Sequence, residues 1–173
     1  DLRGWLRRTA TDGNHAVDQP LEFAFLEWHG DLILPSDFIE RFPSDGSLIR
    51  VCRIHDGQLS TYSAEWGAVP VGPSVVCIAF AAKPHVHQPV ATRPNTLKEL
   101  AALLHAHGAD LYATLREELP TKAPEALREK PLMLLLLLPM QRHADGEIEL
   151  QQVVAAVTER STREVGEAVG AWI

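Results

Sequence analysis

The stretch "PLMLLLLLPM", residues 131–140, limits what this chain can fold into more than any other. Seven unbroken apolar residues, Leu132–Leu138, stand between two prolines. The run is far shorter than the ~20 apolar residues that a membrane-spanning helix needs. At this length a strand covered on both faces fits better than a helix. We therefore predict a central, buried strand.

Further strands follow from the spacing of apolar residues. The segment 74–82, "SVVCIAFAA", is apolar on both faces and predicts a second central strand. Alternation in residues 47–66 predicts a hairpin with its tight turn at Asp56-Gly57. Residues 21–34 predict two strands joined at His29–Asp31, and residues 148–159 predict another.

Helical patterns occupy the remaining segments. Residues 1–8 and 35–42 predict short helices, the second capped by Ser36. Leucines at three- and four-residue steps after Thr96 predict two helices separated at Gly108, and residues 120–131 predict a linker. Ser161 and Glu164 form a capping box that opens a last helix through Trp172. We expect one α+β (mixed α/β) domain over residues 1–173, with a mostly antiparallel sheet of about six strands and three or four helices.

Net charge and composition limit the classes of partner and the compartment that we expect. The net charge is −7 and no basic stripe occurs, so we expect neither DNA nor RNA as a partner. No signal peptide or spanning helix is visible, so we expect a cytoplasmic protein without a membrane partner. Cys52 and Cys77 lie in apolar runs, as buried thiols of a reducing compartment do. The chain opens without Met and stops within a helical pattern, and we expect it to be part of a longer protein.

Two histidines carry the only metal-binding pattern. His85 and His87 are two residues apart, so in a strand they point to the same side and can approach one metal ion. Catalytic zinc uses three protein ligands and one open position. His105 and His107 share no helix face, and we expect His107 at the edge of the core. The other four, His15, His29, His55 and His143, fall in predicted turns, where we expect no catalytic role.

Residues 85–99 resemble the JAMM (MPN/JAB) metallopeptidases, whose signature is His-x-His-Pro followed by Pro-Ser-x-x-Asp at the start of a helix. His85-Val86-His87 matches the first part, and Pro94-Asn95 lies where that family has Pro-Ser. The resemblance implies a zinc isopeptidase with ligands His85, His87 and Glu99 and an upstream base, for which Glu27 is the candidate. Lys98 stands in the place of the metal-binding aspartate, and this cation favours a site without zinc.

Residues 130–172 resemble an accessory segment that precedes the nucleotide-binding domain in bacterial ubiquitin-activating-type (ThiF-like) proteins. The shared features are a long apolar strand, a turn, a second strand and a helix that ends in Gly and an apolar residue. This resemblance implies a role in a ubiquitin-like conjugation pathway as a binder of a protein partner. An exposed sheet edge can recruit an extended tail by strand pairing.

Three functions therefore remain open. The first is a non-catalytic interaction or accessory domain of a bacterial ubiquitin-like conjugation or related defence system, with no cofactor and a ubiquitin-like protein or conjugation enzyme as partner. The second is a JAMM-type zinc isopeptidase, either intact or degenerate. The third is a domain of an unrelated bacterial conflict or signalling protein. The lysine at position 98 favours the first.

Overall fold

The structure is a computed structural model that describes residues 31–42, 49–56, 60–67, 74–86 and 94–172. The helix expected at 1–8, the strand expected from Leu21 and most of the turn after it lie outside these residues. The described strands are β1 (Asp31–Ile33), β2 (Ile49–Asp56), β3 (Ser60–Trp66), β4 (Ser74–Ala81), β5 (His85–Val86), β6 (Pro131–Gln141) and β7 (Ile148–Ser161). The helices are α2 (Phe38–Arg41), α3 (Leu97–Ala106), α4 (Leu111–Lys122), α5 (Thr162–Val169) and the 3-10 helix η1 (Glu125–Leu127).

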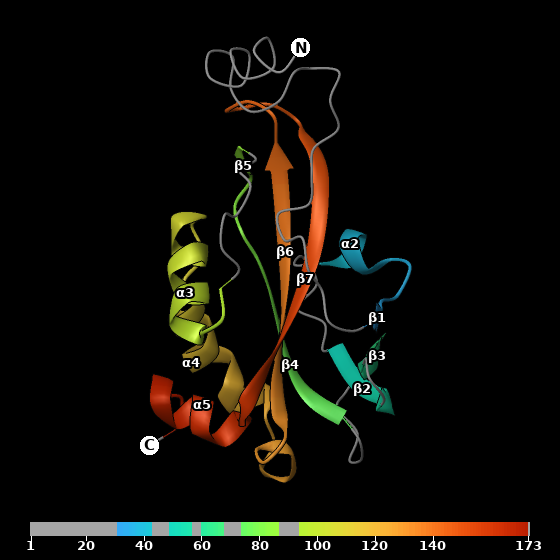
Figure 1. Cartoon of the computed structure of the whole chain (residues 1–173), viewed down its shortest axis with the longest axis vertical. Coiled ribbons are helices and arrows are strands. Elements are labelled where there is room, and N and C mark those ends of the chain that lie inside the picture. The colour runs from blue at the N-terminus through green and yellow to red at the C-terminus, as the bar shows by residue number, and fades with distance from the viewer. Residues whose placement is uncertain (1–30, 43–48, 57–59, 68–73, 87–93, 173) are drawn as a thin grey trace, which may run out of the picture.

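The described strands form one sheet in the order β1-β3-β2-β4-β6. β5 pairs with Met140 and Gln141 of β6 beyond the point where β4 leaves that strand. β7 also pairs with Met140, so it lies on the opposite side of β6 from β5. β6 is thus the central strand that its apolar run predicts, and β7 is its outer neighbour (Figure 1).

Alternate residues of β6 enter two different parts of the core. The even-numbered leucines 132, 134 and 136 join the cluster formed with α3, α4 and α5. Met133, Leu135 and Leu137 join the cluster on the other face, with residues of α2, β2 and β3. All residues from Leu132 to Met140 are buried. A strand covered on both faces needs apolar side chains on both, which explains the continuous apolar run.

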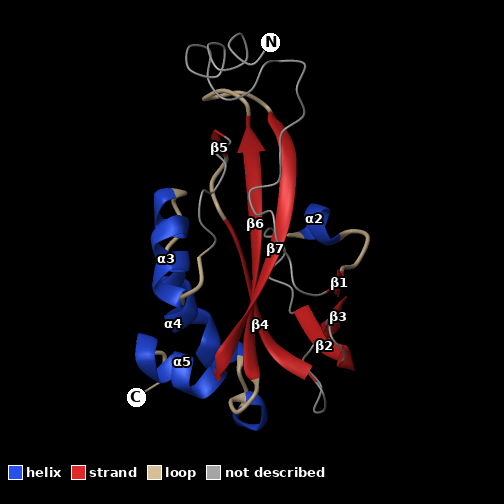
Figure 2. Cartoon of the chain, viewed as in Figure 1, coloured by secondary structure: helices blue, strands red, loops and turns tan. Residues whose placement is uncertain are grey.

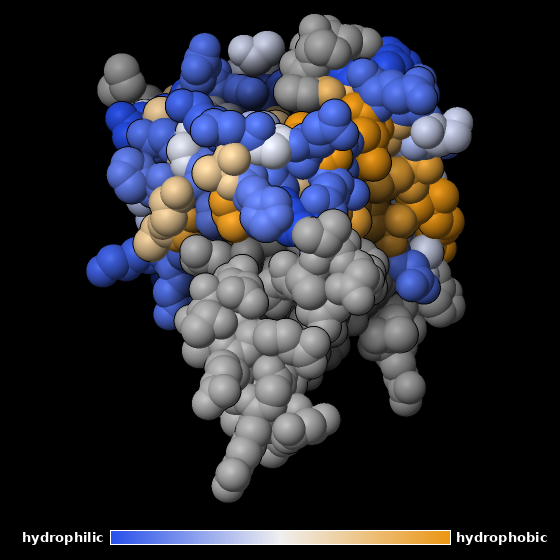
Figure 3. All heavy atoms as spheres, turned by 90° about the horizontal axis from the view of Figure 1, so that it is seen from above, coloured by the Kyte–Doolittle hydropathy of each residue, from blue (hydrophilic) through white to orange (hydrophobic). Residues whose placement is uncertain are grey.

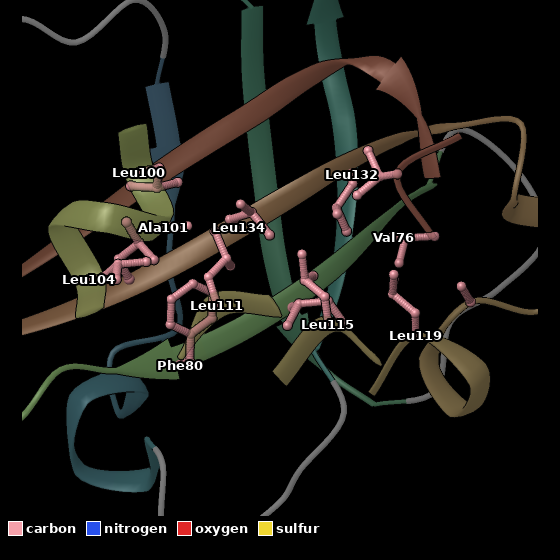
Figure 4. Close-up of a cluster of buried hydrophobic side chains, with 14 of the residues drawn as sticks. Val76, Phe80, Leu100, Ala101, Leu104, Leu111, Leu115, Leu119, Leu132 and Leu134 are labelled. Atoms are coloured by element: carbon pink, nitrogen blue, oxygen red, sulfur yellow. The ribbon is translucent and has the colours of Figure 1, made fainter. Parts of the chain in front are cut away.

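The helical layer covers one face of the central strands (Figure 2). Its buried side chains come from α3 (Leu100, Ala101 and Leu104) and α4 (Leu111, Leu115 and Leu119), and they meet Val76 and Phe80 of β4 and Leu132 and Leu134 of β6 (Figure 4). Thr96 and Glu99 form a capping box at the start of α3, and Ser161 and Glu164 form another at the start of α5. Both capping boxes use a side chain and a backbone N–H three residues apart, so the sequence specifies them locally.

Most sequence-based expectations for the fold are confirmed. The α+β class, the hairpin formed by β2 and β3, the break at Gly108 and the strands β4, β6 and β7 are all present. Among the described strands, three pairings are antiparallel and three are parallel, so the sheet is mixed. Two of the parallel pairings join β4 and β5 to β6, and α3 and α4 form the connection to that strand. Within the described residues, no helix has the length and apolar character to cross a membrane.

Three local expectations are wrong. The last helix ends at Val169, before Gly170 in the left-handed conformation, and does not continue through Trp172. Asp37, rather than Ser36, precedes α2, and its carboxylate accepts a hydrogen bond from Trp66 Nε1 at 2.7 Å instead of capping the helix. The linker expected from residue 120 is partly helical, because α4 continues to Lys122 with Pro120 in its exposed last turn. Because proline has no N–H, position 120 cannot donate to the carbonyl of residue 116. This loss is tolerated in an exposed last turn, where water can hydrogen-bond that carbonyl.

Candidate protein-binding edge and histidine pair

The predicted metal ligands do not come together within the described residues. His85, on β5, lies against His107, the residue that ends α3, with ring centroids 4.0 Å apart. Glu99 lies in the first turn of the same helix, about 12 Å from His107 along the helix axis. His87 and Glu27 lie outside the described residues, so the complete zinc set stays a prediction. No group of three or more metal-ligating side chains occurs among the residues that the structure describes.

Glu99 is engaged at the start of α3. Its Oε2 accepts hydrogen bonds from the backbone N–H of Asn95 at 2.8 Å and of Thr96 at 3.2 Å. The Thr96 hydroxyl oxygen in turn accepts from the Glu99 N–H. Two oriented donors hold this carboxylate, and a metal at its Oε2 would compete with both.

The histidine pair closes the far end of α3 against β5. His85 Nδ1 lies 3.0 Å from the carbonyl oxygen of Lys83, and the Lys83 N–H donates to the carbonyl of His107 at 3.1 Å. Partial burial, with a smaller contribution from His85, holds the pKa of His107 below its usual value. Burial favours the uncharged form of His107, and its ring packs against that of His85 at an interplanar angle of 31°, which joins β5 to the end of α3.

Cys77 offers no nucleophile. Cys77 is buried in the core face that contains Met133, and burial raises the pKa of its thiol to about 12. Cys52 is half-buried in β2. A reactive cysteine needs a lowered pKa and access to solvent, so the structural assignment made from the sequence holds for Cys77.

The outer edge of β7 is the feature that the sequence analysis did not identify as a site. Within the part of the chain that the structure describes, β7 pairs with β6 alone. The strand has 14 residues, whereas most strands have five or six. One long side of it therefore carries backbone donors and acceptors for which no strand among the described residues provides partners.

Two hydrogen bonds of β6 identify which β7 residues turn their backbone groups outward. The carbonyl of Leu137 accepts from the Ala82 N–H at 2.9 Å, on the side of β6 where β4 lies. Successive residues of a strand turn their backbone groups to opposite sides, so even-numbered β6 residues face β7. The Leu132 N–H agrees, since it donates to Thr158 Oγ1 at 3.0 Å.

The register carries this alternation into β7. Leu134 lies opposite Ala156, and Leu136 lies opposite Val154, so even-numbered β7 residues turn their backbone groups toward β6. The odd-numbered residues of the middle of the strand turn theirs outward. These residues are Gln151, Val153, Ala155 and Val157.

A groove of about 870 Å³ follows this edge. Its apolar lining comes from Leu97 and Leu100 of α3, Val165 and Ala168 of α5, and the middle of β7. Its polar lining includes Lys98, Glu159 and Arg160. Val157, at 40% exposure, is one of the most exposed large apolar residues of the described chain. Seen from above, the described surface is largely hydrophilic, with apolar residues gathered on the right-hand side of the view (Figure 3).

Charged side chains line part of the groove, whereas the middle of β7 carries none. Glu164 is held at the start of α5 by the backbone and hydroxyl of Ser161, which keep the pKa of this carboxyl below its usual value. Between Glu149 and Glu159, the nine residues "LQQVVAAVT" contain no charge, glycine or proline. Natural edge strands usually carry such residues to prevent pairing. This neutral stretch is the sequence signal that could have identified the edge.

Comparisons with protein-family models, with curated proteins and with solved structures found no match to this chain. The resemblances to JAMM peptidases and to ThiF-like accessory segments therefore stay expectations from short motifs.

Proposed function

We propose that this chain is a non-catalytic protein-interaction domain that pairs the outer edge of β7 with an extended strand of a protein partner. The observation that carries the proposal is a 14-residue outer strand with a neutral centre and outward backbone groups beside a groove of about 870 Å³. Strand addition at such an edge gains affinity from main-chain hydrogen bonds and specificity from alternate side chains in adjoining pockets.

The biological context that we propose is bacterial ubiquitin-like conjugation or a related defence system. Its support is the resemblance of residues 130–172, which comprise β6, β7 and α5 and so form the edge and part of its groove. The proposed partners are proteins of such a cytoplasmic system, and the net charge of −7 argues against nucleic acid. No cofactor enters this proposal.

A peptide library tests the proposal without knowledge of the partner. Peptides of about eight residues, displayed at random, would span the neutral part of β7 at roughly 3.3 Å per residue. Binders selected on the wild-type chain are then measured on Val157→Pro, which removes one outward N–H, and on the matched control Val157→Thr, which keeps it. We expect Val157→Pro to weaken binding about tenfold or more and Val157→Thr to change it little.

Two outcomes would contradict the proposal. The first is a set of binders that Val157→Pro does not affect. The second is a library without binders while the wild-type chain is monomeric in solution.

Zinc analysis of the same preparation addresses the isopeptidase alternative. The contact of His85 Nδ1 with the Lys83 carbonyl favours that alternative, because it leaves Nε2 open for a metal. Zinc at one equivalent that is lost in His85→Ala would support the enzyme over the binding domain.

A further inference from the structure

We infer that the strand that occupies the β7 edge is β7 of a second copy of this chain, paired antiparallel about a two-fold axis at Ala155. The inference rests on the proposed function, since it names the partner of the proposed edge. In the resulting dimer, the β6–β7 sheets of the two copies form one continuous sheet.

The composition of the β7 edge indicates that another strand pairs with it. Neutral strands with β-branched residues and no proline are templates for pairing with any available strand. The middle of β7 has this composition, "LQQVVAAVT", and its outward residues Val153 and Val157 are partly exposed. A free edge of this kind would favour uncontrolled aggregation, so a defined occupant is expected.

A second copy fits because the strand is complementary to itself. A two-fold axis places each residue opposite the residue of the second copy that lies equally far from the axis on its other side. The side chains of each such pair must therefore be compatible. With Ala155 at the axis, Val153 lies opposite Val157 and Val154 opposite Ala156. Apolar residues thus meet apolar residues at the centre.

The polar ends of the strand match in the same register. Gln151 lies opposite Glu159, whose carboxylate can accept from its amide N–H groups, and Gln152 lies opposite Thr158, so a polar residue faces a polar residue there as well. Leu150 lies opposite Arg160, whose aliphatic stem can cover it while the guanidinium stays in water. No two like charges face each other between residues 150 and 160.

Neighbouring registers are worse. An axis at Val154 places Glu149 opposite Glu159, and like charges opposite each other destabilise a strand pair. An axis at Ala156 places Val153 opposite Glu159, which pairs an apolar residue with a charged one. An axis at Val153 places Gln151 opposite Ala155. Only the Ala155 register keeps the apolar and polar parts of the strand together.

The direction of the backbone groups is compatible with an axis at Ala155, as it is with an axis at any other residue of the strand, so the choice of register rests on the facing side chains. Odd-numbered residues of β7 turn their N–H and C=O groups outward, as the β6 register shows. With Ala155 at the axis, the facing pairs that exchange hydrogen bonds are 155 with 155 and 153 with 157. These pairs include three of the four outward residues of the neutral stretch, and Gln151 lies opposite Glu159, where the pairing of β6 and β7 becomes irregular.

Sedimentation velocity on the full chain tests the inference. We expect the fraction of dimer to rise with concentration and dimers to be populated by about 100 μM, where even a weak association is detectable. Val157→Lys should raise the dimer dissociation constant about tenfold or more, because each copy then places a charge against Val153 of the other. Val86→Lys is the matched control, since Val86 is similarly exposed at 37% but lies on β5. It should leave the dimer unchanged.

Thiol crosslinking tests the register. A short bifunctional reagent should join Val153→Cys to Val157→Cys when the two variants are mixed, and should join either variant to itself far less. The wild-type chain, with half-buried Cys52 and buried Cys77, gives the background.

The outcomes separate this inference from the proposed function. A wild-type chain that is monomeric at all concentrations, or a dimer that Val157→Lys does not weaken, overturns the second copy as the occupant. Peptides that still bind a monomer and lose affinity in Val157→Pro would then keep the proposed function and assign the edge to a foreign strand. Crosslinking of Val153→Cys with itself but not with Val157→Cys also overturns the inferred register.

Discussion

Single residues fix the end of α5 against the core. Trp172 lies over Gly166, its Nε1 donates to the carbonyl of Arg163 at 3.3 Å, and the guanidinium of Arg128 lies 4.3 Å from the centre of its ring. A Cβ atom at position 166 would overlap the indole ring. Gly166 is therefore present for close approach, although an alanine would favour the helix itself.

We predict that Gly166→Ala destabilises the chain by about 1–3 kcal/mol, as overpacking typically does. The helix propensity of alanine would act in the opposite direction by about 1 kcal/mol, so the net sign reports the packing of Trp172. Urea unfolding measures the free energy, and the control Glu167→Ala alters the exposed neighbouring position. A Gly166→Ala variant as stable as the wild type would contradict the contact.

Residues that act locally were predictable, and residues that act across the fold were not. The capping pairs Thr96–Glu99 and Ser161–Glu164 follow from three-residue spacing alone. The contact of Asp37 with Trp66 joins residues 29 positions apart, so local spacing suggested Ser36 as the cap instead. The contact of His85 with His107 likewise depends on where β5 meets the end of α3.

At the scale of elements, the sequence predicts which strands exist better than how they pair. Apolar runs and alternation predicted β4, β6 and β7, because burial on one or two faces leaves a local signature. The outer position of β7 depends on which strands flank β6, and no local pattern records this. Pro139 illustrates the limit, since β6 continues through it. Proline lacks an N–H, and at residue 139 this N–H would face the gap between the ends of β4 and β5.

We predict opposite effects of proline at neighbouring β7 positions. At concentrations where the chain is monomeric, Val157→Pro should cost little stability, since its N–H turns outward, whereas Ala156→Pro removes a hydrogen bond to β6 and should cost about 3 kcal/mol or more. Thermal unfolding of the two variants measures the difference. Equal destabilisation would contradict the assignment of inward and outward backbone groups.

At the scale of the whole molecule, β6 joins the two parts of the core. Its even-numbered side chains pack with α3, α4 and α5, and its odd-numbered side chains pack with α2, β2 and β3. Trp172 packs against the first cluster and Trp66 against the second, where it stacks on Phe38 at 5.8 Å. β6 contributes side chains to both clusters. If β6 unfolds, both clusters lose these side chains together, so the strand couples the stability of the two faces.

We therefore predict a single cooperative unfolding transition. In a Trp5→Phe, Trp28→Phe background, fluorescence of Trp66 and Trp172 reports the two faces, and single-tryptophan variants of each should give coincident urea curves. Leu135→Ala removes a fully buried side chain from the Trp66 face. It should lower the free energy of unfolding by about 2–5 kcal/mol in both reporters. A shift of the Trp66 curve alone would mean that the two faces unfold independently and that β6 does not couple them.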